Sequence, residues 1–420
     1  MISIVSTLAL TSGGYSLAMR EFADRRDAYE SSVLVLTSIM ALVIGGAFLA
    51  FSGFFVELTG LSPTLLGLMF VGLLVSPAWD FWTLRQRYEY KYRLSFALSI
   101  LSAVLSTALS VCAVLFVSSQ QMQADLAEVR LIANYLVIYG FAGAMWCVLM
   151  LRGRTLYNRR FWKFSLNLSL PLIGYSIASQ VLNVSDRVMI ANMVGEAETG
   201  IYGVLYTASS ISLFLWSSIN SSFIPYLYQH IDEEGHVGIR STSTALLGVF
   251  SLVSILISWM APEIIAVLAT DEYLSAVQIM PPIAAGVFLT SLSNMYSNVL
   301  VFYKKTKYIM FAAIGAAVVN IALNLVAIPV FGYGAAAYST LFSYVVLAVS
   351  QYAWATRACR QAGRKLSVYE DGKLATIASV SMVATMLGIF LYSMDAIRYA
   401  ACALLLIAAV YLLLYSKKSR

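Results

Sequence analysis

The sequence predicts an all-α, polytopic membrane protein of about thirteen transmembrane helices. Its 420 residues are 60% hydrophobic and only 11% charged, whereas soluble domains carry about 25% charged residues. Its mean hydropathy is +0.79, and apolar runs near the length of a membrane-spanning helix recur along the chain. These runs are apolar all round, without the period-two alternation of a membrane β-barrel.

The apolar runs define the expected helices, with ends uncertain by about two to four residues. In chain order they cover residues 1–19, 31–51, 61–82, 94–117, 131–151, 166–192, 200–226, 241–260, 275–302, 308–331, 333–356, 374–393 and 396–415.

Basic residues give the expected orientation. Of the 27 Lys and Arg residues, all but Arg130, Arg187 and Arg398 fall in alternate loops or in the C-terminal tail. Positive loops stay in the cytoplasm, so we expect these loops and the C-terminus to be cytoplasmic. The net charge of +6 is explained in this way and does not indicate a nucleic-acid partner.

The spacing of the runs indicates an internal repeat. The segments Leu10–Phe22 and Leu215–Leu227 occupy equivalent places in their runs, and the runs that follow correspond at similar offsets. We therefore expect an N-terminal lobe of five helices (1–165), a C-terminal lobe of six (166–366), and two additional helices with a basic tail (367–420). The run 166–192 has no counterpart in the first lobe, so we expect one helix to be missing upstream. Parallel repeats are typical of transporters with a site between lobes.

The central stretch resembles a known family. Residues 170–190 (LPLIGYSIASQVLNVSDRVMI), 200–209 (GIYGVLYTAS), 219–228 (INSSFIPYLY) and 84–93 (LRQRYEYKYR) resemble the Wzx-type oligosaccharide flippases, which belong to the multidrug/oligosaccharidyl-lipid/polysaccharide (MOP) exporter superfamily.

The resemblance implies a V-shaped, MATE-like bundle in a bacterial cytoplasmic (inner) membrane. It implies translocation of undecaprenyl-pyrophosphate-linked oligosaccharide, such as O-antigen, capsule or exopolysaccharide repeat units, by alternating access driven by an ion gradient. The implied partners are this lipid-linked oligosaccharide, membrane lipids, a polysaccharide polymerase and glycosyltransferases.

One polar stripe is the main candidate for the wall of a cavity. Ser176, Gln180, Asn183 and Arg187 follow one another at helical spacing and share a face. Polar groups inside a membrane turn toward partners or water, and a guanidinium suits phosphate. The alternative is a structural latch in which Asp186 or another acid pairs with Arg187.

Further polar residues inside apolar runs are candidates for substrate contact. They are Asn220, Asn294, Asn298, Asn320 and Asn324. Hydrogen bonding between helices explains such residues as well as substrate contact does. Asp80 and Asp186 are candidates for binding a coupling ion, although Asp80 could instead pair with the arginines that follow it.

Motifs for other chemistry are missing from the sequence. There is no Walker A loop, no pattern for a metal or cofactor, and no long outer loop for catalytic residues, so we expect a transporter and not an enzyme. Three alternatives stay open. They are another exporter of the superfamily (lipid II or multidrug), a membrane-embedded glycan polymerase or ligase, and an inactive truncated remnant.

Overall fold

The computed structural model of the chain describes residues 13–59, 62–120, 125–232, 237–363 and 367–418. Within these ranges every regular element is a helix and no strand occurs, which confirms the all-α prediction. Most of the predicted run 1–19 lies outside the described residues.

The helices of the first part of the chain are α2 (Gly13–Glu21), η1 (Ala23–Arg25), α3 (Arg26–Ala50), α4 (Ser52–Thr59), α5 (Pro63–Tyr88), α6 (Tyr92–Ser119) and α7 (Leu126–Gly153). Those of the second part are α8 (Arg159–Met193), α9 (Glu196–Ser210), α10 (Ser212–His230), α11 (Val237–Trp259), α12 (Ala261–Leu268), η3 (Asp271–Ile279), α13 (Met280–Phe302), α14 (Thr306–Phe331), α15 (Ala335–Gln361), α16 (Asp371–Leu391) and α17 (Asp395–Lys418).

Eight of the described helices are long and apolar enough to cross a membrane, namely α3, α5, α6, α7, α11, α13, α14 and α16. The expected total of about thirteen spans therefore stays a prediction. Two of the longest helices, α8 and α15, are not among the eight, because polar side chains interrupt their apolar faces.

The chain divides into two compact units. The N unit comprises the residues up to Ile173 together with Ile224–Tyr228, and the C unit comprises Gly174–Phe223 and the residues from Gln229 onward. The division after Ile173 falls inside α8, and the expected lobe boundary between residues 165 and 166 stays a prediction.

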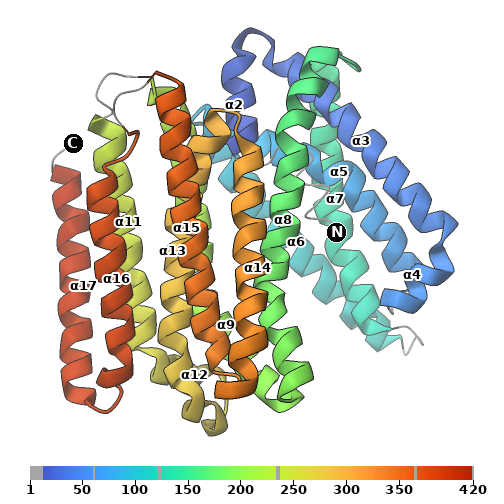
Figure 1. Ribbon diagram of the computed structural model, residues 1–420. Coiled ribbons are helices and arrows are strands. Elements are labelled where there is room, and N and C mark those ends of the chain that lie inside the picture. Colours follow the sequence, from blue (N-terminus) through green and yellow to red (C-terminus); the bar gives the residue numbers. More distant parts are fainter. Residues whose placement is uncertain (1–12, 60–61, 121–124, 233–236, 364–366, 419–420) are drawn as a thin grey trace. The chain divides into compact units, whose positions relative to one another are not determined.

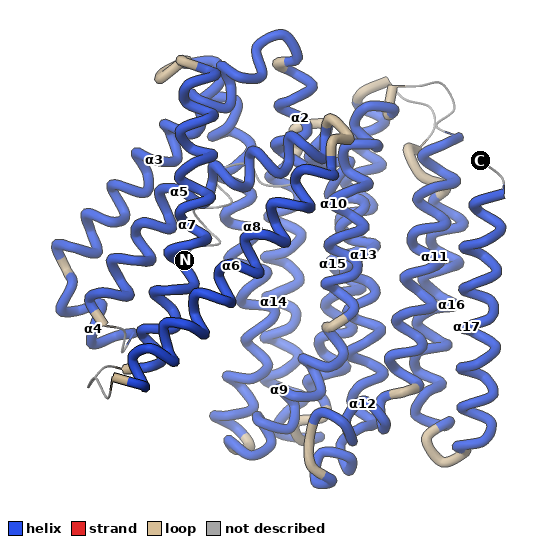
Figure 2. The backbone as a smooth tube through the Cα atoms, turned by 180° about the vertical axis from the view of Figure 1, so that it is seen from behind, coloured by secondary structure: helices blue, strands red, loops and turns tan. Residues whose placement is uncertain are grey.

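In the N unit, α7 is the helix that joins the others. It packs against α3, α5 and α6, and Figures 1 and 2 show α3, α5 and α7 side by side. Side chains fix where two of these helices begin, because Ser62 caps α5 by accepting from the N–H of Leu65 at 3.2 Å and Asp125 caps α7 by accepting from the N–H of Ala127 at 2.9 Å.

In the C unit, α13 is the central helix. It packs against α9, α11, α15 and α16, and nearly all of its residues are buried. A helix that is buried on every side lies in the middle of a bundle, which is the place that α13 takes.

The helices α16 and α17 attach to the C unit through α11. The Trp259 indole N–H donates to the carbonyl of Ala384 at 2.8 Å, and Tyr392 Oη donates to the carbonyl of Ser258 at 2.7 Å. Both units thus consist of helices fastened by a few polar bonds within largely apolar contacts.

One predicted run is divided in the structure. The run 200–226 forms two helices, α9 and α10, which meet at Ile211. Around this point three serine hydroxyls donate to carbonyls of their own chain, Ser209 to Leu205, Ser210 to Thr207 and Ser212 to Ser209. Serines that bond back to the backbone weaken regular helix geometry.

Candidate functional site

Asp186 is a buried carboxylate in α8 of the C unit, with a side chain that is 1% exposed. It accepts hydrogen bonds from Tyr202 Oη at 2.8 Å, Asn324 Nδ2 at 2.7 Å and Thr340 Oγ1 at 2.5 Å. These donors come from α9, α14 and α15. Four helices therefore meet at one carboxylate, and every donor is uncharged.

A wider set of hydrogen bonds surrounds this carboxylate. Ser185 Oγ donates to Asn320 Oδ1 at 2.9 Å, and Asn320 Nδ2 donates to Thr340 Oγ1 at 3.3 Å. We call the set Ser185, Asp186, Tyr202, Asn320, Asn324 and Thr340 the Asp186 cluster. One acceptor is left over, because the buried Oδ1 of Asn324 has no hydrogen-bond partner among the described residues.

Local sequence explains how the cluster is assembled. Asn320 and Asn324 lie one turn apart on the same face of α14, and Asn324 Nδ2 also donates to Asn320 Oδ1 at 3.3 Å. Thr340 follows shortly after α15 begins, so the turn at Gly332, with φ of +75°, sets its position beside α14. Glycine adopts such a φ without strain.

The chemistry of the cluster favours a small cation or a proton. Burying a carboxylate costs free energy unless it is compensated, and a charged residue inside a membrane marks a functional site. The neighbouring oxygens are carboxylate, hydroxyl and amide oxygens, the ligands that hard cations prefer. The unpartnered Oδ1 of Asn324 is a further oxygen suited to this role.

A second polar layer lies on the same helix as Asp186. Asn183 Oδ1 accepts from Tyr206 Oη at 2.7 Å and from Tyr344 Oη at 2.9 Å. The guanidinium carbon of Arg187 lies 4.9 Å from the centre of the Tyr206 ring. This cation–π contact positions the guanidinium of Arg187 over the ring of Tyr206.

The latch between Asp186 and Arg187 is not found. No ion pair joins these two residues within the described chain, where Asp186 faces its three donors and the buried Nε of Arg187 has no hydrogen-bond partner. Adjacent residues of a helix point in directions about 100° apart, so the two side chains enter different surroundings.

The other candidates have mixed surroundings. Gln180 is exposed and Ser176 is half-buried. Asn298 Nδ2 donates to Asn220 Oδ1 at 2.7 Å, which fits the interhelical alternative for this pair. Asn294 is half-buried on α13. Contact of any of these residues with a substrate stays a prediction.

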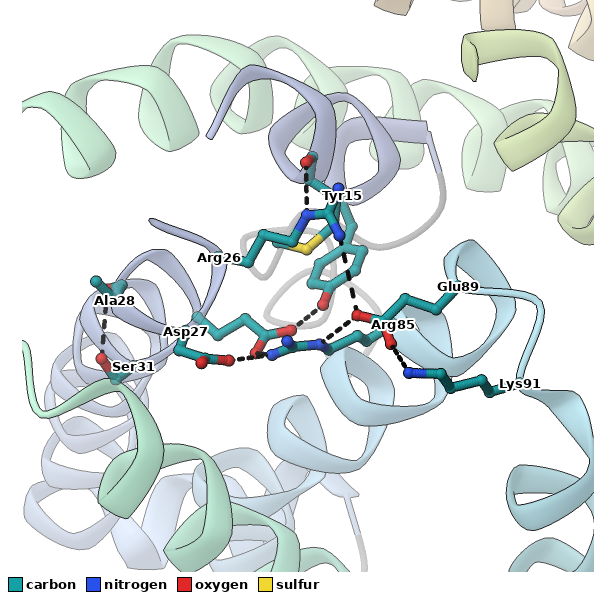
Figure 3. Close-up of polar contacts among 10 residues, drawn as sticks. Tyr15, Arg26, Asp27, Ala28, Ser31, Arg85, Glu89 and Lys91 are labelled. Carbon is teal, nitrogen blue, oxygen red and sulfur yellow. Dashed lines mark hydrogen bonds and ion pairs between the residues drawn. The ribbon is translucent and has the colours of Figure 1, made fainter. Parts of the chain in front are cut away.

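Asp80 in the N unit is half-buried on α5 and forms no ion pair within the described residues. Two arginines were expected beside it. The charge of Arg87 acts on Asp80, whereas Arg85 is engaged elsewhere. It binds Asp27, Glu30 at 2.7 Å and Glu89 at 3.0 Å, and Figure 3 shows its guanidinium between Asp27 and Glu89.

The charged network around Arg85 was missed in the sequence. Glu30 has a side chain that is 1% exposed and also accepts from Tyr15 Oη. Arg85 was taken as a topology signal, and Glu30 stands just before an apolar run. The available signal was the carboxylate itself, at the edge of that run and one turn after Arg26.

Tyr202 and Thr340 were also missed, for a different reason. Both belong to helices separate from the one that carries Asp186, and spacing along one helix does not reveal which other helix it faces. The only available signal was the pair of tyrosines, Tyr202 and Tyr206, four residues apart on one face of α9.

Known proteins share the architecture that holds this cluster. Residues 171–326 match the family model MatE. This segment includes every member of the Asp186 cluster except Thr340. No curated protein sequence matches the chain significantly.

Solved structures of transporters match the chain over most of its length. A multidrug-resistance MATE family transporter of the MOP superfamily, in an outward-facing conformation, is 14% identical with a TM-score of 0.63, over 86% of this chain and 85% of that chain. The fold is that of the MATE transporters. A MOP superfamily transporter from Pyrococcus furiosus is 14% identical, with a TM-score of 0.62 over 85% of this chain and 84% of that chain. A Vibrio cholerae MATE transporter mutant is 12% identical, with a TM-score of 0.65 over 86% and 85%.

These matches agree with the sequence at a coarse level. The chain is a multi-pass membrane protein with a MATE-like transporter fold, and its central part matches the model of that family. Both findings concern the superfamily and do not distinguish the Wzx type from its other branches.

Proposed function

We propose that the chain is a flippase of the MOP superfamily that moves undecaprenyl-pyrophosphate-linked oligosaccharide across a bacterial cytoplasmic membrane. In this proposal it works by alternating access, and cation or proton binding at Asp186 drives the cycle. The observation that carries the proposal is a buried carboxylate, bonded only by neutral groups from four helices, inside a transporter fold.

The Asp186 cluster supports the coupling role through its charge. The three donors to this carboxylate are uncharged, so a positive ion that reaches it meets no competing cation and gains a strong local interaction. The donors of Asn324, Tyr202 and Thr340 already occupy most of the acceptor sites of the carboxylate, so we expect an ion that binds there to shift them. Since α9, α14 and α15 supply those donors, a change at Asp186 acts on several helices at once.

Arg187 supports the choice of an anionic lipid substrate. Its guanidinium lies over Tyr206, has no carboxylate partner in the described chain and keeps a buried Nε free of hydrogen bonds. Arginine binds phosphate oxygens through parallel hydrogen bonds. The identity of the glycan carrier rests on the resemblance of residues 84–93 and 170–228 to the Wzx-type family.

Complementation tests the proposal directly. The gene is deleted in its host, surface polysaccharide is labelled, and the strain is complemented with wild type, Asp186→Asn or Arg187→Gln. We expect wild type to restore surface glycan, Asp186→Asn to abolish export because the charge is lost, and Arg187→Gln to reduce export at normal expression. Full export by Asp186→Asn would remove the carboxylate from the coupling mechanism.

The main competing function is multidrug export. It is suggested by one matching structure, that of a multidrug-resistance MATE transporter, although a match at 14% identity shows the fold alone. One assay distinguishes the two functions. A deletion strain that keeps its surface glycan but accumulates cationic dyes would favour multidrug export, and loss of glycan without dye accumulation would favour the flippase.

A further inference from the structure

A groove between α15 and α16 is present in the C unit. It has a volume of about 360 Å³, and its floor is formed by α13. The three helices run alongside one another (Figures 1 and 2). Most of its lining is apolar, for example Leu292 of α13, Val349 of α15 and Met382 of α16.

One end of this groove is acidic. Asp371, the first residue of α16, lines it and accepts from Tyr296 Oη at 3.1 Å and from Ser367 Oγ at 2.5 Å. No basic side chain pairs with Asp371 within the described residues. Lys373 instead pairs with Glu370 at 2.6 Å, and Arg240 of α11 donates to the carbonyl of Ser367 at 2.7 Å.

Two aromatic rings stand at the same end. Tyr296 and Tyr352 both line the groove, and their rings meet edge to face with centroids 5.3 Å apart. A carboxylate beside tyrosine rings is the arrangement that binds an ammonium group, because the ring faces and the carboxylate both attract positive charge. The acidic end therefore fits a cationic head, and the apolar part fits a hydrocarbon chain.

The two ends of the groove lie at membrane levels that suit an ammonium headgroup and an acyl chain. Asp371 begins a helix that is long and apolar enough to cross a membrane, so it lies near the level of lipid headgroups. Met382 lies further along α16. At a rise of 1.5 Å per residue, it is roughly 16 Å from Asp371 along the helix axis. The apolar end of the groove, near Met382, thus lies at the level of the acyl chains.

We propose that this groove binds a phospholipid with a primary ammonium headgroup, of the phosphatidylethanolamine type. The ammonium lies at Asp371 beside the paired rings of Tyr296 and Tyr352, and one acyl chain follows α16 toward Met382. The site is separate from the Asp186 cluster and does not depend on which substrate the protein exports.

Native mass spectrometry of the purified full-length chain tests the proposal. The protein is titrated with phosphatidylethanolamine and with phosphatidylglycerol of the same acyl chains. The quantity compared is the midpoint, the lipid concentration at which half of the protein carries one bound lipid. We expect phosphatidylethanolamine to bind more tightly. Asp371→Asn should weaken it about tenfold, since one charge-assisted hydrogen bond is lost, and should leave phosphatidylglycerol unchanged.

Glu370→Gln is the matched control. It removes a carboxylate at the adjacent position, which pairs with Lys373 outside the groove, so it should leave both midpoints at their wild-type values. Ser379→Phe provides a second variant, because Ser379 lines the groove and a larger side chain should block the acyl chain. Equal midpoints for the two lipids in wild type, or an unchanged phosphatidylethanolamine midpoint in both Asp371→Asn and Ser379→Phe, would overturn the proposal.

Discussion

At the scale of single residues, Asp186 depends on neighbours that carry no charge. Its three donors are hydroxyl and amide groups, and none of them brings a positive charge to the carboxylate. Losing one of them leaves part of a buried carboxylate without a hydrogen bond, which is more costly than losing an ordinary surface bond.

Tyr202→Phe tests this dependence. The ring stays buried while the hydroxyl that donates to Asp186 Oδ2 is lost. We expect a loss of about 1–3 kcal/mol in the free energy of unfolding, visible as a lower melting temperature in detergent. Thr207→Val, which removes an exposed hydroxyl bonded only to a carbonyl of its own helix, should change stability little. Equal effects of the two variants would contradict the role of the Asp186 hydrogen bond.

The charged network of the N unit makes a second residue-scale prediction. Arg85→Met leaves the buried Glu30 without its cation, and we expect a loss of about 3–5 kcal/mol, as for other broken buried pairs. Glu30→Gln added to Arg85→Met should recover part of this loss, which a double-mutant cycle measures.

The control for this network is an exposed pair. Lys373→Met breaks the pair with Glu370. The side chain of Lys373 is 68% exposed, so this substitution should lower the free energy of unfolding by at most about 1 kcal/mol. If Arg85→Met cost no more than that, Arg85 would not be a structural cation.

At the scale of elements, α3 and α7 approach closely at one glycine. A Cβ added to Gly153 would lie 2.1 Å from the carbonyl oxygen of Asp27, and Ser31 Oγ is almost as near. Ser31 also donates to the carbonyl of Thr155 at 3.1 Å and accepts from its N–H at 3.2 Å. The end of α7 is therefore fixed against α3 by a contact that has no room for a side chain.

Gly153→Ala should force these helices apart. Because the obstructing atom belongs to the backbone, we expect a loss of about 1–3 kcal/mol, typical of overpacking. Gly140→Ala is a matched control in the same helix, since a Cβ there meets nothing within 4 Å, and alanine favours helix by about 1 kcal/mol over glycine. A thermal shift of the same sign for both variants would argue against the close contact.

Sequence patterns predicted the elements better than the connections between them. The runs 94–117 and 308–331 lie within the observed α6 and α14, because continuous apolarity is a direct requirement of the membrane. The helix α8 begins earlier than expected, at Arg159, since Asn158 Oδ1 accepts from the N–H groups of Arg160 and Phe161. Such a local cap lies in a polar segment that hydropathy does not detect.

The candidate site was predicted only in part for a physical reason. Asp186, Asn320 and Asn324 stand out because polar residues are rare in apolar runs. Tyr202 and Thr340 are common residue types in such runs, and only the packing of α9 and α15 against α8 brings them to the carboxylate.

At the scale of the whole molecule, charge asymmetry predicts the orientation. All but three of the 27 basic residues fall in alternate loops or in the tail. Two of the exceptions have particular surroundings, since Arg187 lies over Tyr206 and the buried Arg398 pairs with Glu263 at 2.5 Å and Asp395 at 2.8 Å. Arginines held in this way are poor guides to topology.

Reporter fusions at the C-terminus check the orientation. A green fluorescent protein fused after Arg420 should fluoresce, and alkaline phosphatase fused at the same place should be inactive, because positive segments stay in the cytoplasm. The reverse pair of results would mean that the C-terminus lies outside.

The burial of α13 has a consequence for membrane thickness. The apolar part of α13 is 78% buried within the protein, against 22% for α6 and 11% for α7. A helix enclosed by protein does not have to match the bilayer, whereas exposed helices must tilt or deform the lipid around them when thickness changes. We therefore expect a thinner or thicker bilayer to strain the N unit through α6 and α7 while leaving α13 unaffected.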